Sequence, residues 1–215
     1  MSFHNNISEF LSFFIIILSF FLLRTQSIKT AIKYAAIQGV VAALGVAIIN
    51  PHKFWLFSSM VVVIKGFIFP YILNSVMEKT NISFFNRKSI ADSYIYLIFF
   101  LFLIISVKSV GRIPMSFANP WVFISSVLTV FSSLLFFVIS KNILSQIVGY
   151  IFIENGIYML GVSLSVEQPS IVETALLLDI FIAIFIMGIV SFHVIKNIKD
   201  EDVDALSELK DSEEN

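Results

Sequence analysis

Four ionisable residues of this chain lie inside long apolar stretches, where charged side chains are rare. They are Lys65, Glu154, Glu173 and Asp179. A charge near the centre of a bilayer costs roughly 2.5–3.5 kcal/mol even on a lenient insertion scale, so such residues face a bundle interior or a water-filled cavity and commonly mark an ion path. Carboxyl and amine groups that gain and lose protons are what a relay requires. The chemistry that these residues indicate is proton transfer within a membrane.

Each of these residues also has a structural explanation. Ser170 followed by Glu173 fits a capping box, in which both side chains bind the free amides of a helix start. Asp179 lies two helical turns further in, too deep for that role, and its alternative is a buried hydrogen bond. For Glu154 the alternative is a structural ion pair with Lys65. A pair that can break is also a relay, so both interpretations stay open.

The spacing of the last two acids leaves a partner subunit as one of two explanations. Six residues at 100° each place Glu173 and Asp179 about 120° apart around a helix axis. They cannot line one narrow channel wall. Either protein surrounds the helix, or the two acids contact different neighbours, one of them in another chain.

Further polar residues in the same segments are Asn155, Tyr158, Gln146, Lys33 and Gln38. They could add steps to a relay, but we favour hydrogen bonding between helices as their role. Gly66 and Pro70 follow Lys65 closely, so we expect that helix to be kinked or locally opened at the lysine.

The composition is that of a membrane protein. Hydrophobic residues make up 58% of the chain and charged residues only 13%, whereas soluble domains are roughly 45–50% apolar and about 25% charged. Cysteine is absent, which excludes disulfides and thiolate metal sites.

Apolar runs long enough to cross a bilayer define the expected fold. A spanning helix needs about 20 mostly apolar residues. Seven segments qualify: 7–23, 31–49, 54–74, 93–110, 120–140, 143–164 and 170–195. We predict an all-α, polytopic helical bundle with about seven transmembrane helices over residues 1–195, followed by an acidic cytoplasmic tail, 196–215. The first segment has no basic leader and no cleavage site after it, so it is expected to be retained.

The basic residues predict the orientation, because lysine and arginine accumulate in cytoplasmic loops. With the N-terminus outside, the inner side receives Arg24, Lys29, Lys33, Lys79, Arg87, Lys88, Lys141, Lys196 and Lys199. The outer side receives Lys53, Lys108 and Arg112. The sequence therefore predicts an N-out, C-in topology.

Motifs of soluble enzymes are missing from the sequence. It contains no Gly-rich phosphate loop, no G-x-S-x-G and no H-E-x-x-H, and its three histidines are scattered near the membrane edges. We expect no cofactor and no metal in this chain. Its low basic content also argues against nucleic-acid binding.

Two stretches, GYIFIENGIYMLG (149–161) and PSIVETALLLDIFIAIFIMGI (169–189), carry a resemblance. They resemble hydrogenase-4 component E and, more distantly, the small K subunit of respiratory complex I and the C subunit of Mrp-type antiporters. The component E family has this length and a seven-helix layout, with a lysine and a proline that match Lys65 and Pro70. The three helices of the K subunit correspond to 120–195.

The resemblance implies a non-redox membrane subunit of a hydrogenase-4 or formate hydrogenlyase type complex in a bacterial inner membrane. Its partners would be antiporter-like subunits and a hydrogenase or other redox module. The family's proton-pathway roles fall on Glu154 and on Glu173 and Asp179, although Ile151 occupies the place of the K subunit's glutamate, one turn before Glu154. The alternatives are a subunit of an Mrp-type cation/proton antiporter complex and a purely structural membrane scaffold.

Overall fold

The computed structural model describes residues 2–49, 58–80, 92–110 and 119–164, and these are almost entirely helical. The helices are α1 (Ser2–Arg24), α2 (Ile28–Ile49), the π-helical segment η1 (Ile64–Ile68), α4 (Phe69–Thr80), α5 (Asp92–Val110), α6 (Pro120–Ile139) and α7 (Ile143–Leu164). A short α-helical stretch, residues 58–63, runs directly into η1. The predicted all-α class is confirmed for the described residues.

Four of the described helices are long and apolar enough to cross a membrane: Asn6–Arg24, Ser58–Glu78, Pro120–Ile139 and Ile143–Gly161. A shorter apolar helix covers Tyr94–Val110. The predicted segment 170–195 and the tail 196–215 lie outside the described residues, and so do Glu173 and Asp179. Seven spans and the N-out orientation stay predictions.

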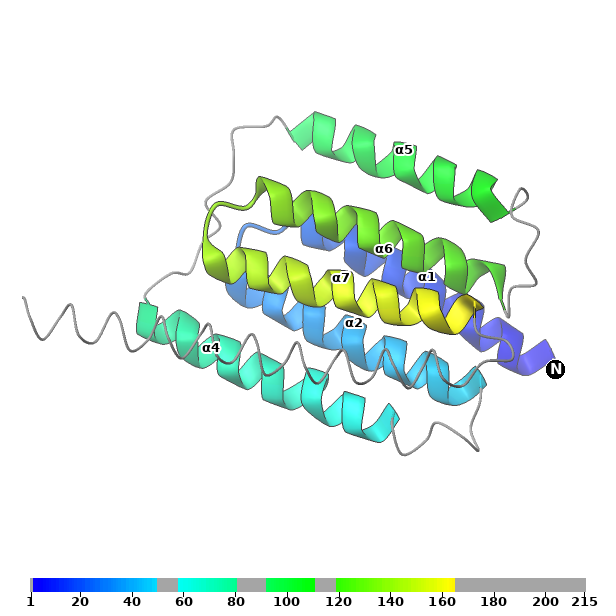
Figure 1. Ribbon diagram of the computed structural model, residues 1–215, viewed down its shortest axis with the longest axis horizontal. Helices are drawn as coiled ribbons and strands as arrows, with labels where there is room; N and C mark the ends of the chain where they lie inside the picture. The colour runs from blue at the N-terminus through cyan, green and yellow to red at the C-terminus, as the bar shows by residue number, and fades with distance from the viewer. Residues whose placement is uncertain (1, 50–57, 81–91, 111–118, 165–215) are drawn as a thin grey trace, which may run out of the picture.

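The helices lie side by side and alternate in direction along the chain (Figure 1). α6 and α7 make the most extensive contact, and α6 also packs against α1 and α5. α2 packs against α1, α7, η1 and α4. Consequently α1, α2, α6 and α7 form the inner part of the bundle, with α5 on one side and α4 on the other (Figure 1).

Local sequence explains where α6 begins and ends. The Asn119 side chain accepts a hydrogen bond from the Trp121 amide at 2.9 Å, and Pro120 occupies the first helical position, where a missing N–H costs nothing. At the other end the Ser140 amide donates to the Phe136 carbonyl at 3.1 Å. Ser140 itself has an extended backbone (φ −76°, ψ 136°), so the helix ends there, just before the short connection to α7.

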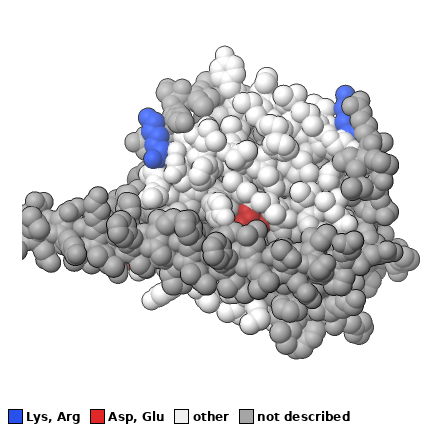
Figure 2. Space-filling view, in the orientation of Figure 1, with Lys and Arg blue, Asp and Glu red and all other residues white. Residues whose placement is uncertain are grey.

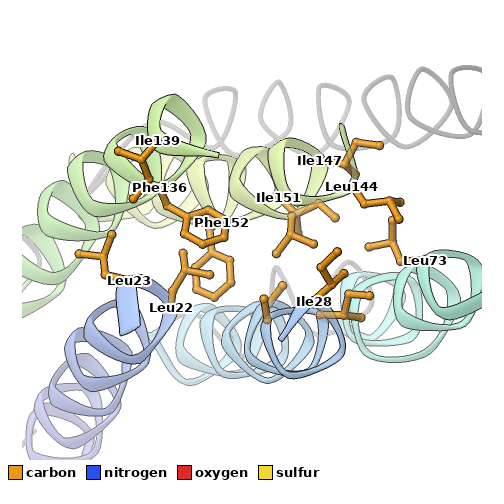
Figure 3. Packing of buried hydrophobic residues seen from close by; sticks show 14 of the residues in the cluster. Leu22, Leu23, Ile28, Leu73, Phe136, Ile139, Leu144, Ile147, Ile151 and Phe152 are labelled. Atoms are coloured by element: carbon orange, nitrogen blue, oxygen red, sulfur yellow. The ribbon is translucent and has the colours of Figure 1, made fainter. Parts of the chain in front are cut away.

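Apolar side chains form two clusters at different heights in the bundle. The larger includes Leu22, Ile28, Phe136 and Phe152, at the end where α1 finishes and α2 and α7 begin (Figure 3). The smaller includes Ile15, Ala42, Ala43, Val61, Val122, Tyr158 and Met159, further toward the opposite end. Between these clusters lies a layer of polar side chains.

The outer surface is apolar along the helices. Phe10, Phe67 and Tyr71 are more than two-thirds exposed, and many other large hydrophobic side chains face outward. On the face shown in Figure 2 the described basic residues lie only at the two lateral edges, with neutral residues between them and one acidic patch in the middle. Such an apolar belt is suited to a lipid bilayer.

Two glycines on one face of α7 let α6 approach closely. A Cβ atom added at Gly156 would lie 2.7 Å from Val130 Cγ2 and 3.0 Å from the Val130 backbone nitrogen. One at Gly149 would lie 3.1 Å from Phe136 Cδ1 and 3.3 Å from the Phe137 Cα. Small residues at helix contacts are how membrane helices pack tightly, because lipid supplies no hydrophobic drive between them.

Replacing Gly156 by alanine is expected to destabilise the bundle by about 1–3 kcal/mol, because the added methyl group would collide with the α6 backbone. Thermal unfolding of the purified full chain in mild detergent measures the loss. Gly45→Ala is the matched control, since its nearest contact would be an ordinary 3.8 Å to Leu11 Cδ1. Equal midpoints for the two variants would contradict this account of the α6–α7 contact.

Candidate functional site

Lys65 lies in η1, where a helical turn contains one residue more than an α-helical turn. The Phe69 amide donates to the Ile64 carbonyl, five residues back, whereas an α-helix would bond four residues back. Pro70 has no N–H, so it cannot make the α-helical bond to residue 66, and a π turn is one way to accommodate that loss. Of the two expected outcomes, a kink or a local opening, the structure shows a local opening. π turns occur frequently at functional sites.

The Lys65 ammonium pairs with Glu154 inside the bundle. Lys65 Nζ lies 3.0 Å from Glu154 Oε1, and each side chain is only 3% exposed. The ammonium also donates to Asn155 Oδ1 at 2.8 Å and lies 5.8 Å from the ring centroid of Tyr158. The pairing that the sequence left open is therefore present, with two more residues of α7 gathered around the same charge.

A glycine of α2 makes room for the lysine stem. A Cβ atom at Gly39 would lie 2.9 Å from Lys65 Cβ and 3.0 Å from Lys65 Cδ. Any larger residue would displace the lysine from its place beside Glu154. Sequence reasoning did not assign this role to Gly39, because nothing in the sequence shows that it faces Lys65.

A chain of hydrogen bonds leads from the ammonium to the other side of the bundle. Asn155 Nδ2 donates to the Ala35 carbonyl at 3.4 Å and to Gln38 Oε1 at 3.5 Å. Gln38 Nε2 donates to Ser19 Oγ and to Thr129 Oγ1, both at 3.3 Å. The polar layer thus joins η1 and α7 to α2, α1 and α6.

The hydroxyl pair that ends this chain was missed in the sequence. Ser19 Oγ and Thr129 Oγ1 lie 3.0 Å apart, and both residues are fully buried. Serine and threonine often bond to their own helix backbone, as Ser19 does to the Ile15 carbonyl at 2.9 Å, so neither stood out. The sequence feature that could have identified them is that Ser19, Thr129 and Gln38 all lie in the interior of long apolar segments.

The remaining predicted polar residues do not belong to this layer. Gln146 donates to the Ser140 carbonyl at 3.3 Å, near the connection between α6 and α7. The Lys33 side chain is exposed. Of the four candidate residues, the structure brings Lys65 and Glu154 together, while Glu173 and Asp179 lie outside the described residues.

Protein-family models, curated proteins and solved structures give no match for this chain. Within the described segments no three His, Asp or Glu residues come close enough together to hold a metal ion. What the polar layer does offer is an amine and a carboxylate in contact. Moving one proton from the ammonium to the carboxylate turns two charges into two neutral groups, so the pair can hold a proton at either site.

Removing one member of the pair is expected to cost more than removing both. Lys65→Met strands a buried carboxylate and Glu154→Leu strands a buried ammonium, and each should destabilise the chain by about 3–5 kcal/mol. The double variant puts apolar groups on both sides and should recover most of the loss. Denaturation of the purified full chain in mild detergent measures these changes.

The control for this series is Lys141→Met, which alters an exposed lysine at the end of the bundle. It should change stability by less than about 0.5 kcal/mol. If the two single changes simply added in the double variant, Lys65 and Glu154 would not be energetically coupled, and the pair would have no role in holding the bundle.

Proposed function

We propose that this chain is a non-redox, polytopic subunit of a hydrogenase-4-like or complex-I-like energy-converting membrane complex, in which Glu154 and Lys65 take part in proton translocation. The observation that carries the proposal is the buried Lys65–Glu154 pair, 3.0 Å apart between two apolar clusters. Retaining an ammonium and a carboxylate there is costly, and apolar residues of similar size are often equally stable or more so. A function that uses the charges gives a reason to keep them.

The surroundings of the pair suit a relay. Glu154 lies beside the ammonium, and Asn155 and Tyr158 also contact it. The π turn that carries Lys65 is a less regular backbone than an α-helix, and such turns occur frequently at functional sites. A proton that moves between the two side chains changes their charges and leaves the backbone bonds of both helices intact.

The resemblance to component E supports the same proposal, because it falls on residues that have distinct jobs in the site. Glu154 pairs with the lysine, Asn155 links the lysine to α2, and Gly156 allows α6 to pack against α7. On the resemblance, Glu173 and Asp179 extend the pathway. The proposed complex supplies antiporter-like subunits and a hydrogenase or other redox module as partners.

The proposal places the chain in a bacterial inner membrane with seven spans, the N-terminus outside and the C-terminus inside. Among the described residues the arrangement of basic side chains supports that orientation. Arg24, Lys29 and Lys141 lie at the end where α1 and α6 finish, whereas Lys108 lies at the opposite end, where α5 finishes. The first end would then face the cytoplasm.

The partners decide between this proposal and its main rival, a subunit of an Mrp-type cation/proton antiporter complex. We expect tagged chain, extracted from native membranes in mild detergent, to bring down large antiporter-like subunits together with a nickel-iron hydrogenase module. Mass spectrometry identifies the chains that migrate with it. Antiporter subunits without a redox module would favour the Mrp-type assignment, and a chain that migrates alone would contradict both.

Glu154→Gln distinguishes a role of Glu154 in proton transfer from a purely structural role of the chain. It keeps the shape of the side chain but removes its exchangeable proton, so we expect the complex to assemble while proton translocation falls by about a hundredfold or more. Translocation is measured in inverted membrane vesicles with a pH-sensitive dye. Glu78→Gln, which changes an exposed acid at the end of α4, is the control and should leave translocation unchanged. Loss of assembly in Glu154→Gln would instead favour the scaffold.

A further inference from the structure

We propose that Gln38 is a positioning residue that acts through Asn155 to give the Lys65 ammonium a second, uncharged acceptor, so that Lys65 stays in place when Glu154 takes up a proton. The inference rests on the proposed function only for the statement that Glu154 changes protonation. The hydrogen-bond chain from Gln38 to Lys65 is independent of it.

The neighbours of Asn155 determine which way its amide points. Asn155 Nδ2 faces two oxygen acceptors, the Ala35 carbonyl at 3.4 Å and Gln38 Oε1 at 3.5 Å. Only the NH₂ end of the amide can donate to them, so the oxygen is left to face the Lys65 ammonium at 2.8 Å. A reversed Asn155 would place N–H groups against the ammonium, where both partners would be donors.

Gln38 is oriented by the hydroxyl pair behind it. The Ser19 hydroxyl donates to the Ile15 carbonyl at 2.9 Å, which leaves its oxygen free to accept from Gln38 Nε2 at 3.3 Å. Thr129 Oγ1 accepts from the same nitrogen at 3.3 Å. With its NH₂ group committed there, Gln38 must present its oxygen to Asn155. Ser19 and Thr129 thus fix the orientation of the Gln38 amide, which fixes that of the Asn155 amide beside Lys65.

An uncharged acceptor matters because its attraction does not depend on the state of Glu154. The ammonium has three N–H donors, and protonation of Glu154 removes the negative charge beside it. The carbonyl oxygen of Asn155 at 2.8 Å and the face of Tyr158 at 5.8 Å remain. Lys65 then keeps its place, and Glu154 is the member of the pair that exchanges protons with a further group.

The amides also keep protons from leaving through α2. A carboxamide donates and accepts hydrogen bonds but does not titrate, so Asn155 and Gln38 cannot pass a proton onward as a carboxylate or an imidazole would. Asn155 and Gln38 therefore hold the Lys65 ammonium in position but do not conduct protons to Ser19 and Thr129.

Glu154→Gln imitates the protonated acid. It therefore tests whether the hydrogen bonds from Gln38 through Asn155 hold Lys65 on their own. In full chain labelled with ¹⁵N-lysine and held in detergent micelles, we expect one ammonium signal that is protected from exchange with water and that is lost in Lys65→Met. That signal should survive in Glu154→Gln and disappear when Gln38→Leu is added. Adding Gln146→Leu instead should leave it, because this amide bonds only near the α6–α7 connection. Loss of the signal in Glu154→Gln alone, or its survival in the Gln38→Leu double variant, would overturn the inference.

A second variant covers the case in which Gln38→Leu does not fold. Thr129→Val keeps the shape of the side chain and removes one acceptor of Gln38, while every residue of α2 and η1 stays unchanged. We expect it to move the Lys65 signal in the otherwise unchanged chain, and to move it no further in an Asn155→Leu background. An unmoved signal, or an equal shift in both backgrounds, would show that Gln38 serves only the packing of α1, α2 and α6.

These readouts need neither partners nor translocation, so the two proposals fail separately. The Lys65 signal could depend on Gln38 while Glu154→Gln still translocates protons normally. That result would support the positioning role of Gln38 and overturn the proposed role of Glu154 in proton translocation. If Glu154→Gln loses translocation but the Lys65 signal does not depend on Gln38, the role of Glu154 in translocation is supported and the positioning role of Gln38 is overturned.

Discussion

An ammonium and a carboxylate buried among apolar helices form the constraint on which the rest of this structure depends. Each charge loses its water, and the attraction between Lys65 and Glu154 offsets that loss only when the geometry is good and the remaining N–H groups find partners. Several features of the bundle meet this requirement together. Gly39 admits the lysine stem, the π turn carries the lysine, and Asn155 accepts a second hydrogen bond.

The polar layer also explains why the bundle holds one arrangement. Lipid supplies no hydrophobic drive between helices, so close packing and interhelical hydrogen bonds decide how the helices pair. Here the hydrogen bonds of Gln38 link α2 to both α1 and α6, and those of Asn155 link α7 to α2. A rotation of any of these helices would leave buried polar groups without partners, which is costly where no water can replace them. The layer therefore sets the register, and the apolar clusters on both sides fill the space around it.

The fold followed from the sequence more readily than the site did. Apolar runs of about 20 residues are a strong pattern, so the segments 93–110, 120–140 and 143–164 are close to α5, α6 and α7. Lys65 and Glu154 were found for a similar reason, because a charge in such a run is rare. Ser19, Thr129 and Gly39 were missed, because hydroxyls that bond to their own helix and glycines in an apolar run look alike whether or not they face a charge. Gly66 and Pro70 predicted a disturbed helix but not its form, since a kink and a π turn both accommodate a proline.

The three adjacent residues Glu154, Asn155 and Gly156 explain how a protonation change can stay local. Successive residues of an α-helix point about 100° apart, so this tripeptide spans much of the circumference of α7. Glu154 faces Lys65, Asn155 reaches both Lys65 and α2, and Gly156 lies against the α6 backbone. Because α7 is held on these sides at one height, it cannot turn to follow its carboxylate. A change in the charge of Glu154 must then be absorbed by side chains, while Lys65, which Asn155 and Tyr158 also contact, keeps its place on the π turn.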